Sequence, residues 1–196
     1  MTMTTSRGEF LSLGMKGGLV LVAGGAVLGA ATAPALGQAS GDVAIAKLAA
    51  TAELLAIDVY GRAIATGLFT GDVLAYMEAA RQNEQDHYDA LAAVLGPQAP
   101  MDVKFTYPAG TFASAKSIAA TGVALETAFV GAYLGAVEAF TDDDLKATAG
   151  LVGANEAQHL TTFKRLAAGN TLVPNPSFPP SLTAKQATAA VTPFLA

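Results

Sequence analysis

The two halves of the sequence repeat one pattern of acidic, aromatic and histidine residues. Each half carries Glu-x6-Tyr followed by Asn-Glu-x-x-His, and the chain has no histidine outside these two phrases. A Glu three residues ahead of a His lies beside it on one face of a helix. The repeat therefore predicts two similar helix pairs, and its candidate functional residues are Glu53, Tyr60, Glu84, His87, Glu126, Tyr133, Glu156 and His159.

Residues 43–168 show the periodicity of helices throughout. They are rich in Ala and Leu, and apolar residues recur at alternating steps of three and four, as on the buried face of a bundle helix. Breaks are expected at Thr70-Gly71-Asp72 and at Thr141, and prolines mark a loop over 96–111. We predict an all-α four-helix bundle with helices at 43–67, 71–95, 112–140 and 142–168.

Loop lengths predict how the helices are connected. The two short breaks make two antiparallel hairpins. The middle loop of about 16 residues can stretch ~50 Å, which is enough to cross the length of a ~38 Å helix. A long crossover is therefore expected between the hairpins. The proline-rich tail, residues 169–196, should wrap the outside of the bundle, with one short helical turn at 183–191.

Residues 1–40 differ from the rest of the chain. Gly17–Ala33 is an uncharged apolar run, and small residues follow it at positions 35, 37 and 39. This order is typical of an export signal, with cleavage expected between residues 35 and 40. The segment Ser6–Leu11 resembles a twin-arginine signal, although Gly8 stands where a second arginine is expected. The alternative is an uncleaved membrane anchor, since about 20 apolar residues can span a bilayer.

Composition excludes several classes of function. The net charge is -5 and no basic block exists, which argues against nucleic-acid binding. The chain has no cysteine, so it has no disulfide, thiolate metal site, iron–sulfur cluster or cysteine nucleophile.

A Glu lies on the buried stripe of every predicted helix. The two glutamates of each hairpin lie at the same height along the bundle. Unpaired buried carboxylates are costly, and four at one point would repel one another unless cations held them. Two divalent metal ions, with one histidine each and bridging carboxylates, would compensate. Oxygen-rich ligands with one imidazole favour iron or manganese, with zinc less suited.

The sequence resembles the ferritin-like superfamily, in which four helices supply Glu, Glu-x-x-His, Glu and Glu-x-x-His to two metal ions. The phrase ALETAFVGAYLGAV, the export signal and the proline-rich tail are similar to an exported bacterial group that includes desiccation-related proteins. The resemblance implies a ferritin-like bundle over residues 43–168 and these metal ligands: Glu53, Glu84, His87, Glu126, Glu156 and His159.

Two details of the implied site stay open. The bridging pair is either Glu84 with Glu156 or Glu53 with Glu126. Tyr60 and Tyr133 match the tyrosine seven residues after the helix Glu in ferritins, which implies a hydrogen bond or a one-electron donor beside the metals. Core packing alone is the alternative for both tyrosines. The preceding asparagines, Asn83 and Asn155, are expected only to bond the backbone.

Two classes of function are expected. One is an exported di-metal redox protein that handles dioxygen or peroxide, as a ferroxidase, peroxidase or manganese catalase, with iron favoured over manganese. The other is a cell-envelope stress or desiccation-related binding protein whose metal site is structural or inactive. The expected partners are metal ions with dioxygen or peroxide, and a homo-oligomer is compatible with either class; contact with a membrane would come only through an uncleaved N-terminus.

Overall fold

The computed structural model describes residues 40–196. Four long helices form the bundle: α2 (Ser40–Ala65), α3 (Gly71–Leu95), α4 (Ala115–Ala139) and α5 (Asp143–Ala167). Short helical segments follow α3 and end the tail: η2 (Gly96–Gln98), α6 (Ala184–Val191) and η3 (Thr192–Phe194). The predicted all-α four-helix bundle is confirmed, and no strand occurs within this range. The predicted export signal lies outside the described residues, apart from Ser40, which begins α2.

The start of α4 lies three residues later than predicted because a serine fixes it. Ser114 has extended backbone, and its side chain accepts a hydrogen bond from the backbone N–H of Ser117. The Ser117 hydroxyl in turn accepts from the backbone N–H of Ser114. This reciprocal cap satisfies donors that the first helical turn leaves free. The periodicity predicts that this helix begins at residue 112, but residues 108–113 form turns.

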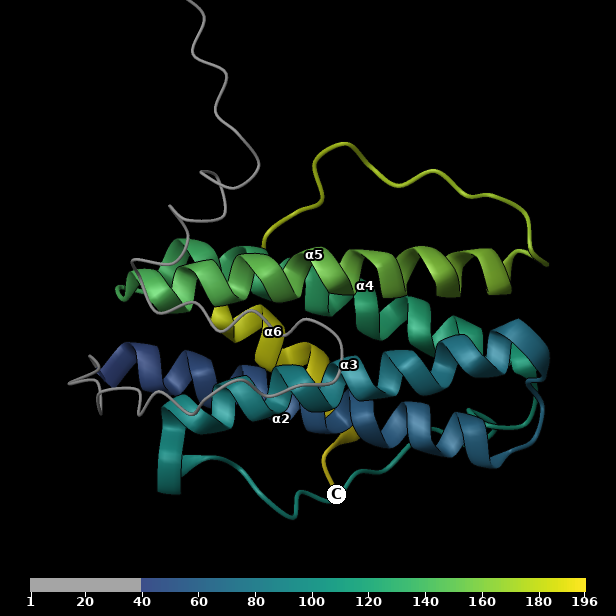
Figure 1. Cartoon of the computed structure of the whole chain (residues 1–196), viewed down its shortest axis with the longest axis horizontal. Coiled ribbons are helices and arrows are strands. Elements are labelled where there is room, and N and C mark those ends of the chain that lie inside the picture. Colours follow the sequence, from purple (N-terminus) through teal and green to yellow (C-terminus); the bar gives the residue numbers. More distant parts are fainter. Residues whose placement is uncertain (1–39) are drawn as a thin grey trace, which may run out of the picture. The chain divides into compact units, whose positions relative to one another are not determined.

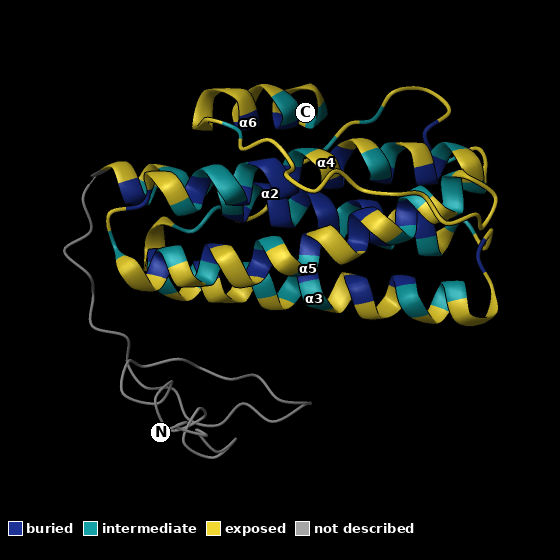
Figure 2. Ribbon diagram, turned by 90° about the horizontal axis from the view of Figure 1, so that it is seen from above, coloured by how far each residue is buried: buried dark blue, intermediate teal, exposed yellow. Residues whose placement is uncertain are grey.

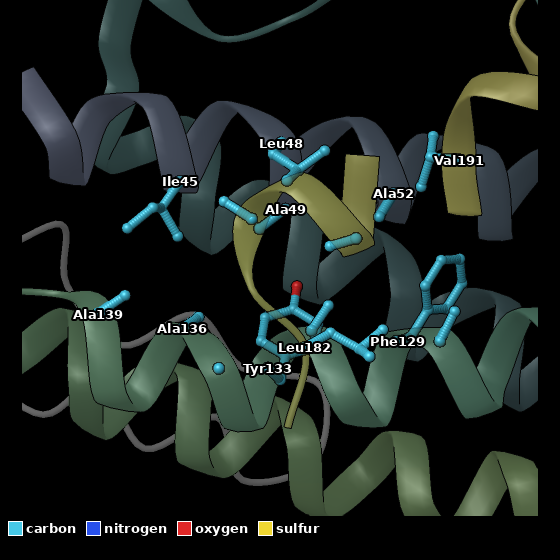
Figure 3. Close-up of a pocket in the computed structure, with 15 residues that line it drawn as sticks. Ile45, Leu48, Ala49, Ala52, Phe129, Tyr133, Ala136, Ala139, Leu182 and Val191 are labelled. Atoms are coloured by element: carbon cyan, nitrogen blue, oxygen red, sulfur yellow. The ribbon is translucent and has the colours of Figure 1, made fainter. Parts of the chain in front are cut away.

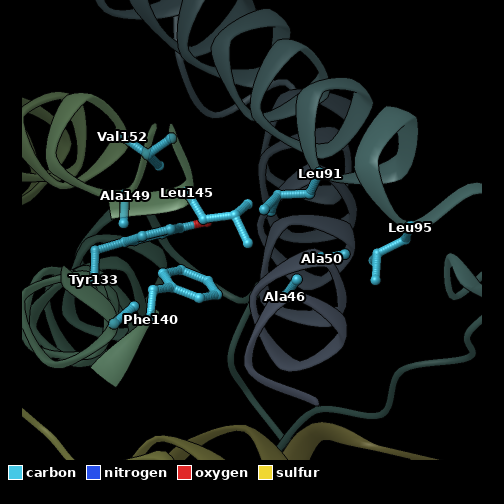
Figure 4. Close-up of a cluster of buried hydrophobic side chains, with 10 residues drawn as sticks. Ala46, Ala50, Leu91, Leu95, Tyr133, Phe140, Leu145, Ala149 and Val152 are labelled. Atoms are coloured by element: carbon cyan, nitrogen blue, oxygen red, sulfur yellow. The ribbon is translucent and has the colours of Figure 1, made fainter. Parts of the chain in front are cut away.

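The helices form two hairpins, α2 with α3 and α4 with α5, which lie against each other (Figure 1). One end of the core joins the start of α2 to the ends of α3 and α4, through residues such as Ala46, Leu95 and Phe140 (Figure 4). The other end joins the end of α2 to the starts of α3 and α4, through Ala63 and Ile118 among others. Helices α3 and α4 therefore run parallel, and the predicted crossover spans the bundle.

The tail returns across the outside of the bundle, as the sequence predicts. Helix α6 lies over α2 and α4, and it buries Ala187 and Val191 against them (Figure 2). Just before α6, the backbone N–H of Leu182 donates to the carbonyl of Gly131 at 2.8 Å. The tail is thus anchored to α4 by main-chain contact as well as by apolar packing.

Helix α4 is long and apolar enough to cross a membrane by length and composition, with a mean hydropathy of 1.4 in its most apolar window. Half of that window is buried inside the protein, and the helix carries the buried Glu126. These features are those of a core helix in a bundle, which is hydrophobic on most sides because other elements cover it.

Asp42 ties the beginning of α2 to the turn between α4 and α5. Its carboxylate is 1% exposed and accepts hydrogen bonds from the backbone N–H of Thr141 at 3.0 Å and of Asp142 at 3.0 Å. The Thr141 hydroxyl donates to it as well, at 2.7 Å. Burial opposes ionisation, but the bonds from Thr141 and Asp142 outweigh it and hold the pKa of Asp42 below its ordinary value.

We expect Asp42→Ala to lower the free energy of unfolding by about 1–3 kcal/mol, because it removes charge-assisted hydrogen bonds at a buried turn. A carboxylate with a lowered folded pKa stabilises the protein above the unfolded pKa of about 3.9 and loses that effect as pH falls through the folded value. Urea unfolding of parent and variant should therefore differ at pH 7 and converge in strong acid. Asp144→Ala, at an exposed position in the first turn of α5, is the control; a constant difference at all pH values between the parent and Asp42→Ala would contradict this account.

Gly135 lets the tail sit directly on α4. A Cβ atom at this position would lie 1.8 Å from the carbonyl oxygen of Leu182. We expect Gly135→Ala to displace the tail and to speed cleavage of residues 168–183 in limited proteolysis. Gly150→Ala is the matched control, because its Cβ meets no atom within 4 Å and Ala is the better helix former. Equal cleavage of both variants would show that the contact does not hold the tail.

Candidate metal centre

The structure brings all six predicted ligands together at the middle of the bundle. Glu53 comes from α2, Glu84 and His87 from α3, and Glu126 from α4; α5 supplies the second Glu-x-x-His pair. The four carboxylates and His159 are buried, whereas the His87 side chain keeps 13% of its surface exposed. The site is therefore enclosed except beside His87.

The six side chains form two groups whose ligand atoms lie within 4.8 Å of one another. One group combines His87 with Glu53, and the other combines His159 with Glu126. Both groups also contain Glu84 and Glu156. Of the two bridging pairs left open by the sequence, the geometry favours the one that both groups share.

The histidines turn Nδ1 toward the carboxylates. The Nδ1 atom of His87 lies 3.1 Å from Glu156 Oε1 and 3.2 Å from Glu84 Oε2. The Nδ1 atom of His159 lies 2.8 Å from Glu84 Oε1 and 3.3 Å from Glu156 Oε2. Neighbouring ligands around an ion with bonds of about 2.1 Å are separated by ~3 Å at right angles. The spacing of these atoms therefore suits a shared coordination sphere.

One oxygen of each glutamate is buried and accepts no aligned hydrogen bond: Glu53 Oε2, Glu84 Oε1, Glu126 Oε2 and Glu156 Oε1. Three of these oxygens lie 2.8–3.4 Å from a histidine Nδ1 atom. Buried acceptors are nearly always satisfied, because an unsatisfied one costs ~1–3 kcal/mol and more when it is charged. The two Nδ1 atoms carry at most one proton each, so the imidazoles cannot satisfy all four oxygens at once. Divalent cations would satisfy all four at once, so the donor set fits the metal ions that the ferritin-like pattern implies.

The two predicted tyrosines lie beside this site and contact it across the repeat. Tyr60 donates to Glu126 Oε1 at 3.0 Å, so a residue of the first half binds one of the second. Tyr133, in the second half, donates to Glu53 Oε1 in the first half. In both glutamates the tyrosine binds one oxygen and leaves the other, unpartnered oxygen in the cluster. The tyrosines thus orient these carboxylates, beyond any contribution to core packing.

Burial and mutual contact shift the titration of these groups. Burial raises the pKa of Glu53 and Glu126 well above the usual value, and the neighbouring carboxylates add to it. Burial alone would lower the pKa of the imidazoles, but the surrounding glutamates raise it to about 12 for His87 and about 9 for His159. Burial alone would raise the pKa of Glu156, but hydrogen bonds from the two histidines outweigh it and lower that pKa to about 2. Without cations, the cluster therefore retains protons at neutral pH.

Two residues contact the site in ways that the sequence analysis did not predict. The Asn83 amide nitrogen lies 3.4 Å from His159 Nε2, so the expectation that Asn83 serves only the backbone is wrong. It contacts the opposite helix because that face of α3 meets α5 at the site. Tyr76, eight residues before Glu84, has its ring edge-on to the His159 ring with centroids 6.3 Å apart. The repeated Asn was a signal for the first residue; Tyr76 has no counterpart in the repeat.

Four helices that converge on buried carboxylates and imidazoles define a helical bundle with a cluster compatible with divalent metal binding. Comparison with known families agrees, because residues 41–169 match the model of the ferritin-like domain family. The chain belongs to this family. No curated protein matches the sequence significantly.

We expect divalent metal to stabilise the protein, and more so as pH rises. The ligands must lose their protons to bind an ion, so protons compete with the metal as pH falls. Thermal melts of iron- or manganese-loaded protein against chelator-treated protein should show a larger difference at about pH 8 than at about pH 6.

The Glu84→Ala variant removes a carboxylate that belongs to both ligand groups, so chelator should change its melting temperature little. Glu78→Ala, on the exposed side of the same helix, should behave like the parent. A parent melt that is indifferent to chelator at both pH values would contradict metal binding.

Proposed function

We propose that this chain is an exported di-metal carboxylate protein that carries out redox chemistry with dioxygen or peroxide, in stress protection or metal handling. The observation that carries the proposal is the set of four buried carboxylate oxygens, one from each bundle helix, for which the two histidine Nδ1 atoms supply too few donors. In this proposal Glu53, Glu126 and the two Glu-x-x-His pairs are the ligands. Glu84 and Glu156, which belong to both ligand groups, would contribute to holding both ions, and iron is favoured over manganese.

When bound, two such ions would supply two electrons to one molecule of dioxygen or peroxide. The protein's part is to hold the ligands at fixed distances and to limit water. The carboxylates are hard anionic donors, which favour the higher oxidation state of the metal. Tyr60 and Tyr133 hold Glu126 and Glu53 in place, and their hydroxyls are close enough to pass a proton to or from those carboxylates.

The exported location rests on the apolar run Gly17–Ala33 and the small residues after it. A location outside the cytoplasm suits a role in stress protection or metal handling at the cell envelope. The absence of cysteine is compatible with an oxidising compartment, because no thiol is exposed to oxidation there.

The test is the oxidation of Fe(II) added to metal-free protein in air. Two Fe(II) ions give two electrons, and with two protons dioxygen becomes hydrogen peroxide. We expect oxidation faster than in buffer up to about two ions per chain, because the site holds two ligand groups. Glu126→Gln should lose most of this activity, by about tenfold or more. Glu138→Gln, exposed on the same helix, should retain it.

Other outcomes separate the alternatives. If iron oxidation matches the buffer control but manganese-loaded protein disproportionates hydrogen peroxide, the protein is of the manganese-catalase type. If the loaded protein does neither, the redox proposal is wrong, and the cluster would serve a cell-envelope binding protein as a structural or inactive site.

A further inference from the structure

The two hairpins face each other through small side chains on α2 and α4. Ala49 and Ala52 project from α2, and Ala128, Ala132 and Ala136 from α4 (Figure 3). Side chains this short do not fill the space between two helices, so they leave a gap where larger residues would interdigitate. Helix α6 and Leu182 lie over the gap and form its outer wall.

The gap is an apolar cavity with a volume of about 40 Å³. An apolar protein cavity of ~150 Å³ holds benzene or xenon and stays dry, and roughly 10–15 Å³ suffices for one water-sized body. The present cavity is therefore too small for an aromatic ring or a long acyl chain, and large enough for a diatomic molecule. Tyr133 is the one lining residue whose side chain carries a polar group, and its hydroxyl is already bonded to Glu53.

The cavity shares its inner wall with the candidate metal centre. Ala52 directly precedes Glu53, and Phe129 follows Glu126 by three residues, which places it one helical turn away. Tyr133 contributes to the lining of the cavity, and its hydroxyl donates to Glu53. The side chain of Tyr133 thus connects the cavity wall to the cluster.

We propose that this cavity is a binding site for dioxygen that supplies the metal centre from the α2–α4 side. The inference rests on the redox function proposed above. An apolar diatomic loses little hydration on entering such walls, whereas a metal cation or hydrogen peroxide would give up strong interactions with water. Polar species therefore reach the centre elsewhere, and His87 marks that side because it is the ligand with exposed surface.

Xenon tests the cavity without any metal or turnover. In crystals of the parent protein pressurised with xenon, we expect a xenon atom among Ala49, Ala132 and Tyr133. Ala132→Leu should remove that atom by filling the space, and Ala49→Leu does the same from the opposite wall if the first variant folds poorly. Ala147→Leu, at an exposed position on α5, is the matched control and should keep it. A parent crystal without xenon in this cavity overturns the proposal.

Kinetics test the route. Fe(II) oxidation by dioxygen should slow by about tenfold in the filled variants, while oxidation by hydrogen peroxide stays at the parent rate. Equal dioxygen rates in the parent and in a filled variant that has lost its xenon would overturn the dioxygen site and leave the proposed function intact. A parent that reacts with neither oxidant would overturn both. Equal slowing with both oxidants would show that filling the cavity damages the centre itself, which also contradicts the proposal.

Discussion

The burial of four carboxylates at one point is the constraint on which the rest of this structure depends. Each would cost several kcal/mol if left charged and unpaired in the interior, so the bundle must bring compensating groups to the same place. The imidazoles of His87 and His159 and the hydroxyls of Tyr60 and Tyr133 do part of this. One oxygen of every glutamate still accepts no aligned hydrogen bond. The apolar clusters at the two ends hold the helices in the register that this centre requires.

The repeat predicted the fold well because its two signals are independent and agree. Apolar periodicity placed four helices, and the equal heights of Glu53 with Glu84 and of Glu126 with Glu156 placed their side chains at one level. Loop length predicted the long crossover, and the residues that meet in the two end clusters confirm it. Boundaries were less predictable: α4 begins after Ser114 because of a local cap, which periodicity does not report.

The candidate site was predicted residue by residue, but its internal pairing was not. Sequence spacing fixes heights along a helix and says little about rotation between helices, so it could not choose the shared carboxylates or show that each tyrosine binds the glutamate of the other half. The contacts of Asn83 and Tyr76 with His159 were missed for the same reason, because they cross from α3 to α5. The cavity under α6 could not be predicted from the sequence either, because it depends on how the tail crosses two helices.

The hydrogen bonds of Tyr60 to Glu126 and of Tyr133 to Glu53 make each half of the chain depend on the other. Each half carries a glutamate whose hydroxyl donor lies in the other half, and each ligand group draws on both halves. A single helical hairpin would therefore present half a centre, and two identical hairpins facing each other would complete it. The architecture has the form of two helical hairpins that face each other, with the crossover loop as their covalent link. The two halves are not equivalent, because His159 is enclosed whereas His87 is partly exposed.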